Sequence, residues 1–196
     1  MNAELITKFY TAFQKRDWQT MNSCYHAHAT FYDPAFRQLD GADVRVMWHM
    51  LCLNAKDFEL TFSKIKVDGN SGVAEWQARY SFSKTGRKVH NQIKAVFTFK
   101  DGLIFDHRDE FDLWKWSRMA LGMPGTLLGW SGFMQDKIHE NARKSLEKFK
   151  IENPMSRWLC HEFPKPQWYF EDVSPLCIDA IVAISSPIKK NTLKSG

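Results

Sequence analysis

The chain has 196 residues, of which 44% are hydrophobic and 25% charged, and its formal net charge is +5. This composition is typical of a soluble globular protein that is long enough to bury a real core. Basic residues are spread along the chain rather than clustered in a stripe, so no nucleic-acid partner is expected.

The first part of the chain is predicted to be mainly helical. Apolar residues recur at a spacing of three to four between Leu5 and Phe13, with Asn2 as the expected N-cap. Asp17 is expected to cap a second helix whose apolar stripe extends to Tyr25. Both helices have one apolar side, so each is expected to cover a hydrophobic face of the fold.

A short strand is predicted at residues 30–33, where the chain reads Thr-Phe-Tyr-Asp. It is expected to end at Pro34, because proline has no N–H to donate to a strand ladder. A third helix is predicted after Gly41, since apolar residues return to helical spacing from Val44 to Leu51.

The apolar period then changes to alternation, which is typical of half-buried strands. Turn signals separate the alternating segments, and Asp101-Gly102 is the strongest hairpin signal among them. The predicted strands cover residues 58–67, 73–83, 87–100 and 103–113. Three helices followed by these strands predict an α+β fold, with the helices on one face of a strongly curved, mostly antiparallel sheet.

Two apolar helices are predicted next, residues 113–121 and 126–150, with a break at Gly122 to Gly125. They carry more Trp, Met, Leu and Phe than one small core absorbs, which favours a dimer interface or a lid over a cavity. We expect a domain at 1–150 that includes these helices and associates as a homodimer. A proline-containing tail, read as extended, is expected at 151–196.

No apolar run is long enough to span a membrane, and the N-terminus does not resemble a signal peptide. We therefore expect a cytoplasmic protein without a membrane partner. The four cysteines lack the spacing of metal ligands, so reduced thiols are expected and no metal or other cofactor is implied.

The predicted strand at 103–113 carries the main functional signal. Side chains alternate along a strand, so His107, Asp109 and Phe111 share one face, together with Phe105. A polar pair in an otherwise apolar wall suits a ligand cavity better than a core. Alternatively, His107 is a core histidine with its hydrogen bonds satisfied, and Asp109 forms a structural ion pair with Arg79 or Arg108.

The order of these elements resembles the nuclear transport factor 2-like superfamily, which includes ketosteroid isomerase, limonene-epoxide hydrolase and the SnoaL-type polyketide cyclases. The resemblance covers about residues 3–115. It is carried by the HATFYDP stretch at 28–34, by Gly41, and by the DGLIFDHRDEFD stretch at 101–112. It implies a cone-shaped α+β fold.

The match to each enzyme of the superfamily is partial. Asp33 falls on the general base of ketosteroid isomerase, but Phe9 and Ala95 stand where that enzyme has its hydrogen-bond donors. Asp109 falls on one acid of the epoxide hydrolases, but Ser81 stands where the second is needed. Asp109 also matches the single acid–base aspartate of the polyketide cyclases, which implies acid–base chemistry centred on this residue.

The predicted catalytic residues are Asp109 as acid or base, His107 as its proton partner, and Asp33 as a second acid–base group on the opposite wall. Asp33 also fits a turn-closing role, because it precedes proline. The predicted ligand-binding residues are Tyr10, Trp76, Tyr80, Asn91, Ala95, Phe97 and Phe111. We expect cofactor-independent isomerase, cyclase, dehydratase or hydrolase chemistry on a small hydrophobic molecule. The alternative is a non-catalytic ligand-binding or dimeric interaction module.

Overall fold

The structure is a computed structural model that describes residues 1–55 and 57–153. Its first half contains α1 (Asn2–Gln14), α2 (Trp18–Ser23), β1 (Tyr25–Asp33), β2 (Arg37–Asp40), α3 (Gly41–Asn54) and β3 (Glu59–Asp68). Its second half contains β4 (Ser71–Ser81), β5 (Lys88–Lys100), β6 (Leu103–Glu110), α4 (Leu113–Leu121), α5 (Met123–Leu128) and α6 (Gly132–Glu152). The predicted α+β class is confirmed.

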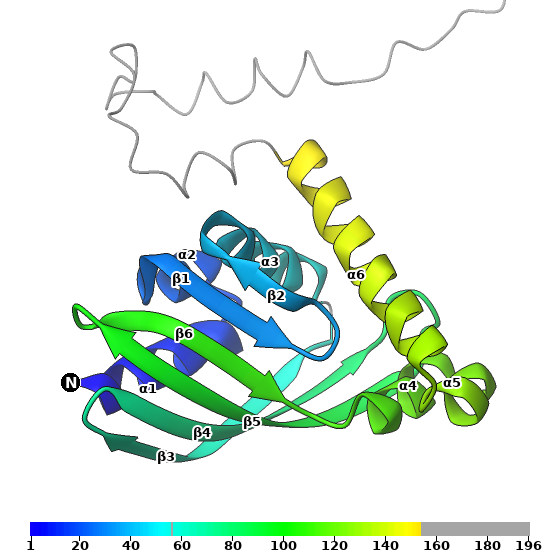
Figure 1. The fold of residues 1–196 in the computed structure, drawn as a ribbon, viewed down its shortest axis with the longest axis horizontal. Helices are drawn as coiled ribbons and strands as arrows, with labels where there is room; N and C mark the ends of the chain where they lie inside the picture. The colour runs from blue at the N-terminus through cyan, green and yellow to red at the C-terminus, as the bar shows by residue number, and fades with distance from the viewer. Residues whose placement is uncertain (56, 154–196) are drawn as a thin grey trace, which may run out of the picture. The chain divides into compact units, whose positions relative to one another are not determined.

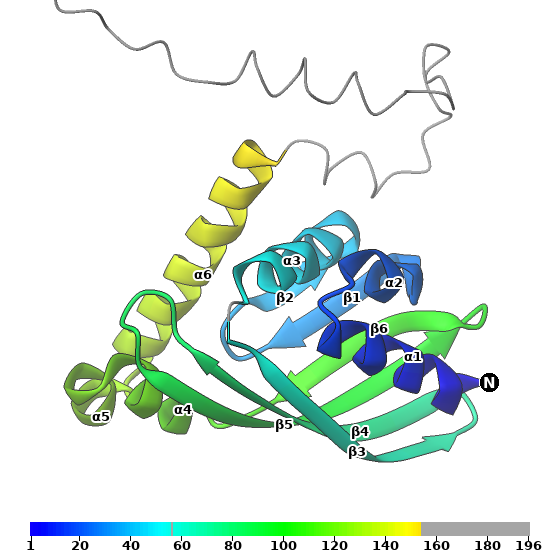
Figure 2. The same ribbon diagram turned by 180° about the vertical axis from the view of Figure 1, so that it is seen from behind.

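The six strands form one open, curved sheet in the order β2-β1-β6-β5-β4-β3 (Figure 1). All neighbouring strands are antiparallel except β1 and β6, which are parallel. This parallel pair places the early strand β1 beside the last strand β6, so residues far apart in the sequence meet inside the sheet. Helix α1 packs against β3 and β4, and α3 packs against β1 and β2 (Figure 2).

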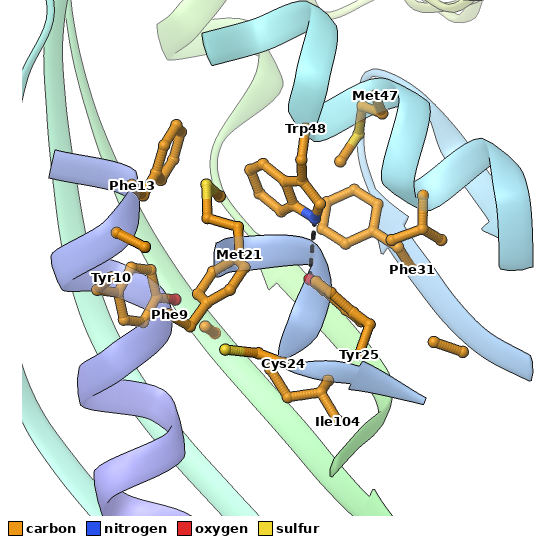
Figure 3. Packing of buried hydrophobic residues seen from close by; sticks show 14 of the residues in the cluster. Phe9, Tyr10, Phe13, Met21, Cys24, Tyr25, Phe31, Met47, Trp48 and Ile104 are labelled. Atoms are coloured by element: carbon orange, nitrogen blue, oxygen red, sulfur yellow. Dashed lines mark hydrogen bonds between the residues drawn. The ribbon is translucent and has the colours of Figure 1, made fainter. Parts of the chain in front are cut away.

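The space between the helices and the sheet is filled by aliphatic, sulfur-containing and aromatic side chains (Figure 3). Phe9 of α1 lies edge-on to Trp48 of α3, with ring centroids 5.3 Å apart. Phe31 of β1 contacts the same indole from the other side at 5.4 Å. Edge-to-face pairs of this kind stabilise a core beyond the area that they bury.

The N-terminal boundaries differ from the predicted ones. Helix α1 begins at Asn2 itself, so the predicted Asn2 cap is wrong; its side-chain amide instead donates to the carbonyl of Gly69. The predicted Asp17 cap is confirmed, because its carboxylate accepts from the N–H of Thr20 at 3.0 Å. Strand β1 begins at Tyr25 rather than at residue 30, because Tyr25 pairs with Ile104 of β6.

A β-bulge in β6 changes which side chains point inward. Phe99 of β5 lies opposite Ile104, whereas Thr98 lies opposite Asp106, so Phe105 is the extra residue between them. Ile104 is therefore fully buried, and the predicted inward direction of Phe105 is wrong. Its ring instead lies 5.2 Å from the ammonium group of Lys100, and the alternation resumes correctly after the bulge.

The predicted strand end at residue 113 is also wrong, because β6 stops at Glu110 and Asp112 caps α4 by accepting from a backbone N–H. The C-terminal segment forms three helices rather than two, with Pro124 in the first turn of α5, where a missing N–H costs nothing. In the described part of the chain, no helix is long and apolar enough to cross a membrane. The predicted tail at 151–196 lies outside the described residues from 154 onward.

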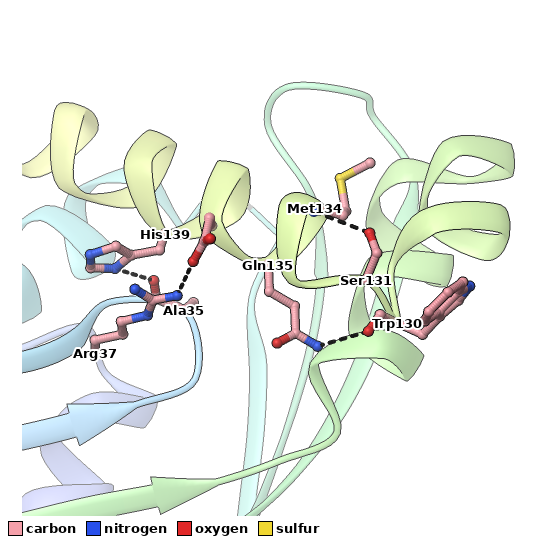
Figure 4. A network of polar contacts seen from close by, with 8 residues as sticks. Ala35, Arg37, Trp130, Ser131, Met134, Gln135 and His139 are labelled. Carbon is pink, nitrogen blue, oxygen red and sulfur yellow. Dashed lines mark hydrogen bonds and ion pairs between the residues drawn. The ribbon is translucent and has the colours of Figure 1, made fainter.

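Helix α6 is held against the turn between β1 and β2 (Figure 4). The imidazole Nδ1 of His139 lies 3.2 Å from the carbonyl oxygen of Ala35, and Asp136 forms an ion pair with Arg37. The same helix also contacts α3. These contacts place α6 beside the end of β1 where Asp33 lies.

Candidate functional site

A chain of hydrogen bonds crosses the interior between the helices and the sheet. His107 and Asp109 of β6 are joined through Nε2 and Oδ1 at 3.1 Å, and the indole N–H of Trp76 donates to the same carboxylate oxygen at 3.1 Å. On the other side, Nδ1 of His107 lies 2.5 Å from the hydroxyl of Tyr25. That hydroxyl accepts from the indole N–H of Trp48 at 2.9 Å (Figure 3).

The two indole N–H groups at the ends of this series of hydrogen bonds fix which group donates and which accepts in each bond. An indole has only an N–H to give, so the hydroxyl of Tyr25 accepts from Trp48 and is free to donate its own proton to Nδ1 of His107. The proton of a neutral imidazole then lies on Nε2, which donates to the carboxylate of Asp109. Burial, reinforced by the charge of Asp109, raises the pKa of Tyr25 well above its usual value, which keeps this hydroxyl protonated.

The polar pair is enclosed by aromatic rings. His107 is 0% exposed and Asp109 is 3% exposed. The ring of Phe97 lies 4.3 Å from the imidazole, and those of Phe31 and Trp48 lie at 5.1 and 6.0 Å. In such a low-dielectric interior each hydrogen bond is stronger than in water.

Within residues 1–55 and 57–153 the hydroxyl of Tyr10 has no hydrogen-bond partner, although the residue is completely buried. Burial raises its pKa well above the usual value, and the charge of Asp109 adds to this effect. Its ring lies beside that of Trp76, with centroids 5.9 Å apart. A buried polar group left without a partner costs roughly 1–3 kcal/mol, so this oxygen is the unsatisfied point of the site.

Asp33 occupies the end of β1 and is half-buried. Its Oδ1 accepts from the N–H groups of Ala35 and Phe36, which confirms the turn-closing role. Burial nevertheless raises the pKa of Asp33 to about 7, and the charge of Asp109 contributes to the rise. A carboxyl group with this pKa exchanges protons near neutral pH.

The predicted ligand-binding residues divide into two groups. Tyr10, Trp76, Ala95 and Phe97 are buried inside the fold, whereas Tyr80, Asn91 and Phe111 are partly exposed. The hydroxyl of Tyr80 accepts from the indole N–H of Trp116 at 2.8 Å. Burial raises the pKa of Tyr80, and the charge of Asp33 adds to the rise. Three surface pockets lie on α6, between α4 and β5, and along α1 and α2. None of the three is lined by Asp33, His107 or Asp109. An open apolar pocket therefore stays a prediction.

Two residues of the hydrogen-bonded chain were not predicted. Tyr25 was assigned to a helix and Trp48 to an ordinary apolar stripe, yet both orient His107. A buried imidazole needs a hydrogen-bond partner on each ring nitrogen, and this requirement was the one sequence signal that pointed to a further polar partner of His107. The alternative ion pair of Asp109 with Arg79 or Arg108 is not formed in the part of the chain that the structure describes: Asp109 pairs with His107, and Arg108 pairs with Asp106 at 3.2 Å. Among the described residues, no three His, Cys, Asp or Glu side chains are placed to hold a metal ion.

Comparison with known proteins places this geometry in context. Residues 6–107 match the family model described as a SnoaL-like domain. An epoxide hydrolase of M. tuberculosis described as LEH-like is similar in structure, with 20% identity, a TM-score of 0.52, and coverage of 66% of this chain and 96% of that one. No curated protein matches the sequence.

Two further solved structures share the fold. A protein of Catenulispora acidiphila DSM 44928 with a ketosteroid isomerase-like fold, in complex with trimethylamine, has 14% identity and a TM-score of 0.55, covering 65% of this chain and 97% of that one. TsrD of Streptomyces laurentii has 23% identity and a TM-score of 0.52, covering 61% and 94%. At these identities the likeness shows the fold alone.

Proposed function

The chain belongs to the SnoaL-like domain family, and from this premise we propose that it binds a small hydrophobic molecule between helices and sheet and acts on it by acid–base catalysis. Isomerisation, cyclisation, dehydration and water addition all need such proton transfers. The observation that carries the proposal is the unpartnered, buried hydroxyl of Tyr10, whose ring lies beside that of Trp76, the residue whose indole donates to the carboxylate of Asp109. Most buried polar groups of a folded protein are hydrogen-bonded, so a buried hydroxyl without a partner needs an explanation, and an oxygen of a bound ligand would supply one.

Each residue has a role in this proposal. Oδ1 of Asp109 is held by Trp76 and His107, so Oδ2 is the oxygen that exchanges a proton with the ligand. His107, oriented by Tyr25, stabilises the carboxylate and takes part of its charge. Tyr10 donates to an oxygen of the ligand, where negative charge develops during proton transfer.

Asp33 is the second acid–base group, because its pKa of about 7 suits proton exchange at neutral pH. It lies at the end of β1, and its charge acts on the partly exposed Tyr80. A ligand that reaches Asp109 must displace aromatic side chains, since that carboxylate is only 3% exposed. The mechanism therefore includes an opening step before chemistry.

The second candidate function is a non-catalytic interaction module. It is favoured by the complete burial of His107 and by the aromatic rings that close around it. In this case the hydrogen-bonded chain would serve only to specify the packing of the core. The two functions differ in whether any small molecule reaches the interior.

The test is turnover on a panel of hydrophobic ketones and epoxides, combined with mass spectrometry of molecules that co-purify with the chain. We expect Asp109→Asn to abolish turnover and Tyr10→Phe to reduce it. Asp106→Asn is the matched control, because Asp106 lies on the same strand and bonds to Thr30 and Arg108 instead. Turnover that is unchanged in Asp109→Asn rules out the acid–base assignment.

A further inference from the structure

Helix α5 is packed with its smallest residues facing the body of the protein. A Cβ atom on Gly125 would lie 2.0 Å from the backbone oxygen of Ser117 in α4, and one on Gly129 would lie 2.1 Å from the Ser117 hydroxyl. Both distances are far below van der Waals contact, so only glycine fits at these two positions. The inner side of α5 is therefore a close backbone contact with α4.

The large apolar side chains of this segment consequently point outward. We call them the α5 ridge: Met123, Leu127, Leu128, Trp130 and Phe133, which are 68%, 61%, 46%, 65% and 67% exposed. Figures 1 and 2 place α5 at the outer corner of the described residues, away from the sheet. In Figure 4 the ring of Trp130 points away from α6. Five large apolar side chains exposed within eleven residues of sequence are typical of an interaction site.

Cationic side chains flank the α5 ridge. A groove of about 780 Å³ lies beside α5, and four basic residues line it: Arg87, Lys88, Lys115 and Arg118. Its one acidic lining residue, Asp112, already caps α4. Within residues 82–88 and 112–134 the sequence has five Lys or Arg and one acidic residue. Only Lys88 of the four pairs with a described acid, Asp57.

We propose that the α5 ridge and its cationic groove dock this chain on an anionic lipid bilayer, which goes beyond the acid–base function and does not depend on it. Exposed Trp, Phe and Leu side chains enter the boundary between headgroups and acyl chains, while neighbouring Lys and Arg bind lipid phosphates. The α5 ridge projects from a corner, which suits insertion into a surface. This inference differs from the sequence-based expectation of no membrane partner.

A second copy of the chain fits this surface less well. A two-fold interface buries the same patch of both copies, so both cationic grooves would lie within or beside it. Like charges brought together across an interface oppose association. The charge pattern therefore favours an anionic counterpart over the homodimer that the surplus of apolar residues suggested.

The test is co-sedimentation of the full chain with vesicles of phosphatidylcholine, either alone or mixed with phosphatidylglycerol. We expect binding to the mixed vesicles that weakens with added salt, because lipid charge supplies part of the affinity. Neutralising Lys115 or Arg118 with glutamine should weaken binding about fivefold each. Leu127→Ser combined with Trp130→Ser should abolish it.

Leu53→Ser is the matched control, because Leu53 is 57% exposed on α3 and lies outside the α5 ridge. Circular dichroism and thermal denaturation should be unchanged in all variants, since every substituted side chain is at the surface. Absent binding, equal binding to neutral vesicles, or full binding by the double variant would overturn the proposal. Self-association that the double variant loses, without vesicle binding, would instead identify a second copy as the occupant.

Discussion

The substitution Tyr10→Phe tests whether the hydroxyl of Tyr10 is left without a hydrogen-bond partner for a ligand or instead supports the fold. The hydroxyl is completely buried and has no partner, so the folded protein bears its desolvation without any compensating hydrogen bond. Removing it should raise the free energy of unfolding by about 1–3 kcal/mol. In a chain of this size, each kcal/mol corresponds to a rise in Tm of roughly 2–4 °C.

Tyr25→Phe is the matched control, because it removes the same atom from an equally enclosed tyrosine. Here the hydroxyl bonds to Trp48 and His107, so its loss leaves two buried groups without partners. At about 1–3 kcal/mol for each group, the free energy of unfolding should fall by roughly 2–6 kcal/mol. The same chemical change is thus expected to act in opposite directions at the two sites.

The assay is urea denaturation of the wild type and both variants, monitored by circular dichroism, with the slope compared to verify that the unfolded state is unchanged. A fall of more than about 1 kcal/mol in Tyr10→Phe would show that its hydroxyl has a partner in the free protein. The support that this hydroxyl lends to ligand binding would then be lost. Stabilisation together with reduced turnover would tie the hydroxyl to the ligand.

Three further predictions concern packing and pH. Gly125→Ala should lower the free energy of unfolding by about 1–3 kcal/mol, because its Cβ would overlap the Ser117 carbonyl. Gly132→Ala is the control: a Cβ there meets open space, so the Tm in thermal denaturation should not change. Burial raises the pKa of Asp33 to about 7, so the stability linked to it is fully present below about pH 4 and is lost as the pH rises to about 7. Asp33→Asn should remove this part of the pH dependence in denaturation curves, and an unchanged slope would contradict it. Burial lowers the pKa of His49, whose Nδ1 is unpartnered among the described residues. Its contribution to the free energy of unfolding is therefore present above about pH 6.5 and is lost on acidification. His49→Gln should flatten the curve of stability against pH on the acid side, and an unaltered curve would refute this.

Local patterns predicted most of the sheet. Alternation correctly assigned Trp76 and Ala95 to the interior, and His107 and Asp109 with them, because the side a residue faces depends only on its position along a regular strand. The rule failed at Phe105, where the bulge inserts one extra residue. A bulge is a property of two paired strands, so one strand's sequence does not reveal it.

The same division applies to the candidate site. The sequence by itself determined the α+β class, the inward His107–Asp109 pair and the turn at Asp33, because each follows from the spacing of near neighbours. Only the tertiary structure decided that Tyr25 and Trp48 hold His107, that Tyr10 is left unpartnered, and that α5 turns its glycines inward. These features depend on contacts between distant segments, above all the parallel pairing of β1 with β6, which no local pattern encodes.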